Sequence, residues 1–73
     1  MPRYTVLLTP EPDEGGYSVR VPALPGLHTQ GDSYREAVEN ARSAIKFHLD
    51  CLAAEGEPIP EQMEEPTLVR VDI

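Results

Sequence analysis

Carboxylates and one histidine–cysteine pair are the residues of this chain whose types could support chemistry. A two-metal nuclease needs several carboxylates that converge on ions held about 4 Å apart, usually from central strands. The segments expected to form the first two strands, residues 4–9 and 17–21, contain no Asp or Glu. The acids lie instead in an expected turn and at an expected helix start: Glu11, Asp13, Glu14, Asp32 and Glu36. We interpret them as solvated loop charges and helix-cap groups, not as a catalytic set.

His48 and Cys51 are three residues apart in the expected helix, so their side chains could meet as a thiol–imidazole nucleophile. Both also flank the apolar stripe of that helix, where such residues commonly belong to the edge of a core, and we favour this interpretation. His28 and His48 could form a metal pair, but no third ligand is evident near either residue. The sequence therefore predicts no catalytic, cofactor or metal site, and we expect a protein that is not an enzyme.

The densest charge run consists of glutamates late in the chain: Glu55, Glu57, Glu61, Glu64 and Glu65. Solvation is the default interpretation of such a run. The alternative is a docking surface for a basic partner, whose binding would weaken steeply with salt. These five glutamates are the candidate partner-binding residues.

The chain has 73 residues, which is enough for one domain with a small core, so we treat residues 1–73 as a single domain. Its single cysteine, Cys51, excludes an internal disulfide and a structural zinc set. Without such cross-links a small fold commonly gains stability by association, and we expect a homo-oligomer, either a dimer or a tetramer.

Thirteen acidic and six basic residues give a formal net charge of -7, which repels phosphate backbones. Direct nucleic-acid binding is therefore not expected. The N-terminal residues lack a basic region followed by a long apolar run, so neither a signal peptide nor a membrane span is expected. A lone thiol fits a reducing compartment, and we expect a cytoplasmic protein.

Alternating apolar residues predict strands over residues 4–9 and 17–21, and a third short strand over 27–30. Gly15 and Gly16 supply the positive φ of a hairpin turn between the first two. Pro25 and Gly26 suit the central positions of a type II turn before the third.

A helix is predicted from about residue 33 to residue 55, with Ser33 and Glu36 at capping-box spacing and Asp32 as a rival cap. Its apolar positions recur at steps of three and four residues and form one stripe: Ala37, Val38, Ala41, Ala44, Ile45, Leu49 and Leu52. The alanines let the helix axis lie close to a sheet.

Residues 57–66 are rich in proline and glutamate and predict an extended tether, and residues 67–72 return to a strand pattern. We expect this last strand to lie parallel to the first through a right-handed crossover. The predicted fold is α+β, with element order β-β-β-α-β, sheet order 3-2-1-4 and one helix on one face.

Several marks along the chain occur in an order and at spacings that resemble a known family: Tyr4, Glu14–Tyr17, Val21–Pro22, Leu24–Gly26, Gly31–Ser33, Glu36–Ala37, Asn40–Ala41, Ala44–Ile45, Gly56 and Ile59–Pro60. Together they span most of the chain, and the pattern is similar to the HicB antitoxins of bacterial toxin–antitoxin systems. The resemblance implies a small partial ribonuclease-H-like fold.

The resemblance also implies a protein that masks a small basic RNA-cleaving toxin, HicA. Family members that bind DNA carry a helix-turn-helix or ribbon-helix-helix segment after this unit, and this sequence stops at Ile73, so we do not expect autorepression. Three alternatives stay open: a family member without a cognate toxin, a small regulatory or structural oligomer, and a minimal hydrolase or nuclease.

Overall fold

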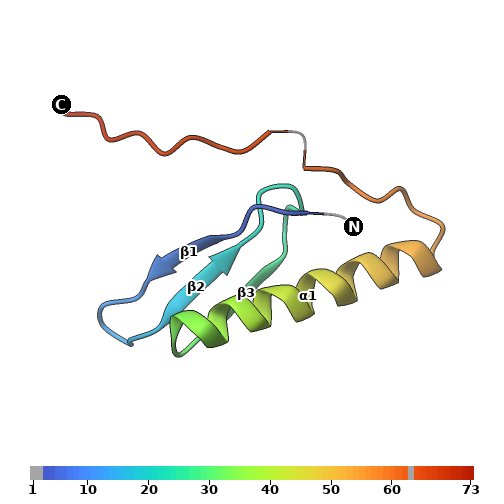
Figure 1. Cartoon of the computed structure of the whole chain (residues 1–73), viewed down its shortest axis with the longest axis horizontal. Helices are drawn as coiled ribbons and strands as arrows, with labels where there is room; N and C mark the ends of the chain where they lie inside the picture. The colour runs from blue at the N-terminus through green and yellow to red at the C-terminus, as the bar shows by residue number, and fades with distance from the viewer. Residues whose placement is uncertain (1–2, 63) are drawn as a thin grey trace.

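The computed structural model describes residues 3–62 and 64–73. Three short strands and one long helix make up the fold: β1 (Leu7–Pro10), β2 (Tyr17–Arg20), β3 (His28–Gly31) and α1 (Tyr34–Ala54). The strands form an antiparallel sheet in the order β1-β2-β3, and α1 crosses one side of it (Figure 1). The chain is therefore an α+β domain. No helix in the described residues is long and apolar enough to cross a membrane.

A tight hairpin joins β1 to β2. The N–H of Gly15 donates to the carbonyl of Glu11 at 2.7 Å, and the N–H of Glu11 donates to the carbonyl of Gly16 at 3.0 Å. Gly15 and Gly16 have φ values of +78° and +76°, in the region that glycine adopts without steric cost. This turn sets the register in which Leu8 lies opposite Val19.

Two successive turns join β2 to β3. The N–H of Leu24 donates to the carbonyl of Val21 at 2.9 Å, and the N–H of Leu27 donates to the carbonyl of Leu24 at 3.1 Å. Pro25 and Gly26 occupy the middle of the second turn, and Gly26 has a φ of +88°. The turns bring Val21, Leu24 and Leu27 to one buried cluster.

The start of α1 carries a reciprocal cap. The Oγ of Ser33 accepts from the N–H of Glu36, and the Oε1 of Glu36 accepts from the N–H of Asp32, both at 3.1 Å. This arrangement gives two otherwise unpaired N–H groups a partner. The helix ends at Ala54, and Gly56 follows with a φ of +73°.

The core lies between the sheet and α1. Ala37 and Ala41 are 0% and 2% exposed and pack against Val19 of β2. Because their side chains are single methyl groups, the helix approaches the strands closely. Farther along α1, three side chains pack on the second cluster: Ala44, Ile45 and Leu49.

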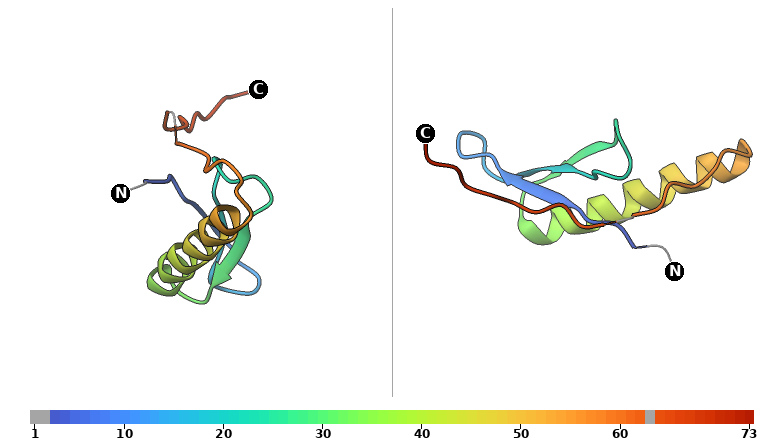
Figure 2. Two further views of the ribbon diagram at one scale, coloured as in Figure 1. Left: turned by 90° about the vertical axis from the view of Figure 1, so that its right-hand side faces the viewer. Right: turned by 90° about the horizontal axis from the view of Figure 1, so that it is seen from above.

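The predicted fourth strand is wrong for this chain. Residues 67–72 form no strand, so the sheet order is β1-β2-β3 and not 3-2-1-4, and no strand parallel to β1 is present in the described residues. Residues 67–73 run along the β1 side of the sheet, and Figure 1 and the left view of Figure 2 show them separated from it. The alternating pattern indicates a local preference for extended backbone. A strand also needs the edge of another strand close enough for hydrogen bonding, and the pattern does not determine that.

β1 begins later than predicted, at Leu7 and not at Tyr4. Extending the observed register by two residues beyond the Leu7–Arg20 pair places Thr5 opposite Pro22, which has no N–H to donate. Beyond Arg20 the chain also turns away from β1. The first residues of the expected strand therefore find other partners.

Candidate functional site

The segment that follows α1 is held to the domain at its middle. The hydroxyl of Tyr4 donates to the carbonyl of Pro60, and the N–H of Thr5 donates to Oε1 of Gln62 at 3.2 Å. Gln62 also donates from Nε2 to the carbonyl of Glu64 at 2.6 Å. We call residues 57–66 the tether; it is fixed at Pro60 and Gln62 against the chain that leads into β1.

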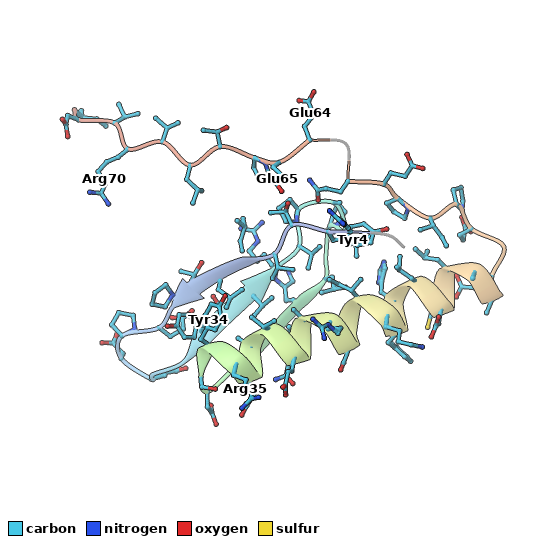
Figure 3. The ribbon with its side chains drawn as sticks, viewed as in Figure 1. Tyr4, Tyr34, Arg35, Glu64, Glu65 and Arg70 are labelled. Carbon is cyan, nitrogen blue, oxygen red and sulfur yellow. The ribbon has the colours of Figure 1, made fainter. Side chains whose placement is uncertain are left out.

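All five predicted partner-binding glutamates lie on this segment or at its start, and all are exposed: Glu55, Glu57, Glu61, Glu64 and Glu65. Glu55 is the C-cap of α1. Glu64 points away from the sheet (Figure 3), whereas Glu65 lines a groove described below. The structure therefore presents the acidic run as a solvated, extended surface along one side of the domain.

The acids at the other end of the molecule do not form a metal centre. Glu11, Asp13 and Glu14 are exposed in the hairpin turn, and Glu36 is engaged in the helix cap. Among residues 3–62 and 64–73, no three side chains of His, Cys, Asp or Glu lie close enough together to hold one metal ion. Asp32 contributes its backbone N–H to the cap.

The histidines and the cysteine are also separate features. His48 is half-buried on α1, Cys51 is exposed one turn later, and His28 is exposed at the start of β3. Within the described part of the chain, no hydrogen bond joins His48 to Cys51. The structure thus shows none of the geometry that a thiol–imidazole pair requires.

A feature that the sequence patterns did not reveal is an apolar groove of about 880 Å³ between the segment leading into β1 and one face of α1. Its walls are residues 3–6 on one side and side chains of the helix on the other: Val38, Ala41, Arg42, Ile45, Lys46 and Leu49. Gln62 and Glu65 lie at its border. Four of these residues belong to the apolar stripe of the helix: Val38, Ala41, Ile45 and Leu49. The sequence predicts the stripe, but it does not predict which part of the stripe the sheet leaves uncovered.

The architecture, the acidic tether and the sequence marks can now be compared with known proteins. The family model described as "HicB_like antitoxin of bacterial toxin-antitoxin system" matches residues 4–70. The chain belongs to the HicB-like antitoxin family. The resemblance inferred from the sequence is thereby confirmed over nearly the whole chain.

Relatives include short proteins and longer ones. A UPF0150 protein of Synechocystis is 46% identical over 59 residues, covering 81% of this chain and 73% of the relative. A UPF0150 protein of Thermoplasma acidophilum is 42% identical over 67 residues, covering 92% of this chain and 96% of the relative. Antitoxin HicB of Escherichia coli is 43% identical over 58 residues, which cover 80% of this chain but 41% of that protein. No solved structure gives a significant match.

Proposed function

We propose that this HicB-like chain is a non-enzymatic binding module that masks a small basic, RNA-cleaving toxin of the HicA type by direct protein contact. The observation that carries the proposal is the family match over residues 4–70, together with the word antitoxin in the names of its longer relatives. The fold adds a surface of suitable charge, since four exposed glutamates lie on the tether and Glu55 precedes it at the end of α1.

The charge of the chain supports a basic partner. A formal net charge of -7 on 73 residues attracts a cationic protein over a distance of about one Debye length, roughly 8 Å at physiological ionic strength. Glutamates at the rim of an interface act mainly on the association rate and on the choice of partner. Two hydrogen bonds hold residues 60–62 in place, so the tether presents its charges from a backbone that is already partly ordered.

The proposal is tested by co-expressing the chain with the product of the adjacent open reading frame, where that frame encodes a short basic protein, and by purifying the two together. A complex that forms at low salt and weakens steeply as salt rises is expected. Affinity that is independent of salt would contradict docking through the glutamates. Separate elution of the two proteins at all salt concentrations would contradict the toxin partner itself.

Charge-removing variants locate the surface. The test variant replaces three tether residues, Glu61→Gln, Glu64→Gln and Glu65→Gln. The matched control removes the same number of charges from the hairpin turn by Glu11→Gln, Asp13→Asn and Glu14→Gln, so the net charge is equal in both. We expect a loss of affinity of at least about tenfold in the test variant and a smaller loss in the control. Equal losses would show that the partner senses net charge and not this surface.

A second candidate function is a regulatory or structural oligomer with no toxin. The observation that favours it is the run of exposed apolar residues beyond the tether, which includes Leu68, Val69, Val71 and Ile73. This candidate predicts a stable homo-oligomer that binds no basic partner, so sizing of the purified chain and the co-purification above test it together.

A further inference from the structure

The groove lies between α1, which packs on β2 and β3, and the segment that leads into β1. Tyr4 and Val6 form one wall, and Ile45 and Leu49 lie in the other. The same four side chains are only partly buried, although all pack against the second core cluster. An apolar hollow of about 880 Å³ at the edge of a domain this small leaves part of its core open to water.

A second unpartnered apolar feature is present in the same chain. Residues 67–73 are extended, and the side chains of Leu68, Val69 and Val71 are 84%, 74% and 71% exposed. In a strand, Val69, Val71 and Ile73 point to one face, and Leu68, Arg70 and Asp72 point to the other. The segment therefore has one fully apolar face of strand type, with nothing in the described residues covering it.

The charge of the groove lining bears on what can occupy the groove. Three of the six basic residues of the chain line the groove: Arg3, Arg42 and Lys46. Residues 67–73 carry one base and one acid, Arg70 and Asp72, so the segment adds no net charge to this basic lining. A basic lining disfavours a basic toxin as occupant and favours an acidic one.

The chain does not close the groove with its own segment. Gln62 bonds to Thr5, and Gln62 and Glu65 border the groove. From Pro66 onward every residue of the chain is exposed. Figure 1 and the left view of Figure 2 show the last residues away from the sheet. If two copies exchange residues 67–73, each segment covers the groove of the other copy, and both apolar features are buried at once. Twofold symmetry makes the two contacts identical, so the assembly stops at a dimer.

We propose that residues 67–73 of one copy bind in the groove of a second copy, as an added strand beside residues 3–6 where the chain leads into the free edge of β1, and that the exchange is reciprocal. Val69, Val71 and Ile73 then face α1 of the second copy, while Leu68 faces outward. Strand addition supplies main-chain hydrogen bonds to an edge that pairs with no other strand in the described residues, and the alternate side chains fill the hollow. This inference does not depend on the toxin proposal, because it concerns the chain alone.

Light scattering coupled to size exclusion tests the proposal on the full chain over a range of concentrations. The wild type is expected to be a dimer, and Val71→Lys is expected to weaken dimerisation by at least about tenfold, because a charged group replaces a buried valine. Leu68→Lys is the matched control, since it introduces the same charge on the outward face, and it should leave the dimer intact. A monomeric wild type, or a dimer that Val71→Lys leaves unchanged, would overturn the proposal.

Cross-linking between separately labelled chains distinguishes exchange from closure within one chain. Both chains carry Cys51→Ser; one also carries Arg42→Cys in the groove and the other Val71→Cys in the segment. A short bismaleimide should join the two in a mixture, giving a product that contains one chain of each kind. If the mixture gives no product, and a chain carrying both cysteines is cross-linked only at the mass of one chain, the segment closes its own groove and the exchange is wrong.

Discussion

Gly31, the last residue of β3, lies against Ala37 in the first turn of α1, backbone to backbone. A Cβ added to Gly31 would collide with the backbone of Ala37 and stand 2.8 Å from the carbonyl carbon of Glu36. Ala37 itself is fully buried. Close approach at this point is what allows a helix to follow the third strand after a turn of only two residues, Asp32 and Ser33.

The first prediction is that Gly31→Ala lowers the free energy of unfolding by about 1–3 kcal/mol, as overpacking of a filled site does. The backbone of Gly31 is outside the left-handed region, so the whole cost is steric. Urea denaturation at one fixed protein concentration measures it. An unchanged midpoint would mean that the start of α1 shifts freely away from β3.

The second prediction separates steric cost from backbone strain by comparing the two glycines of the hairpin. Gly15 has positive φ and open space around it, so Gly15→Ala should cost only the strain of a left-handed alanine, about 1–2 kcal/mol. Gly16 has positive φ and also lies against Gly31 and Asp32. Gly16→Ala should therefore cost about the sum of the Gly15 and Gly31 effects, and equal urea midpoints for Gly15→Ala and Gly16→Ala would contradict this packing.

The third prediction concerns Leu24, which is 1% exposed in the cluster beneath the β2–β3 turns. Leu24→Ala should lower the free energy of unfolding by about 2–5 kcal/mol, since it removes buried methyl groups and leaves a cavity. The control is Leu68→Ala, at a side chain that is 84% exposed, where a change within about 0.5 kcal/mol is expected. Equal effects at the two leucines in thermal and urea unfolding would contradict the assigned core.

The helix cap and the buried face of α1 could be predicted from the sequence, because both depend on residues that are close together in the chain. Ser33 and Glu36 are close in sequence and form their reciprocal hydrogen bonds within one turn of helix. Ala37 and Ala41 recur at helical spacing, and both face the sheet. Such features depend on φ, ψ and periodicity, which the residue types largely determine.

Features that depend on long-range geometry were not predictable in the same way. Residues 67–73 alternate like a strand, but the pattern does not say which edge, in which copy, they can reach. Tyr4 and Val6 also fit a strand, yet Pro22 offers no N–H to the residue opposite it. The groove combines Arg3 with Arg42 and Lys46, which are far apart in the sequence and meet because the segment before β1 lies opposite α1.

The fourth prediction tests the anchor of the tether. Tyr4→Phe removes the hydroxyl that donates to Pro60, which should cost about 0.5–1.5 kcal/mol locally while leaving the sheet and α1 intact. The amide hydrogens of Glu57, Ile59, Glu61 and Gln62 should then exchange faster, and a Glu-specific protease should cleave sooner after Glu61, because local opening becomes easier.

The matched control for the anchor is Tyr34→Phe. Tyr34 is 66% exposed, its ring packs edge-to-face against Tyr17 with centroids 6.3 Å apart, and the described residues give its hydroxyl no hydrogen-bond partner. The same loss of one oxygen should therefore leave exchange and cleavage of the tether unchanged. If Tyr4→Phe behaved like Tyr34→Phe, the tether would be held by the Thr5–Gln62 bond alone, and Gln62→Ala would then be the variant that releases it.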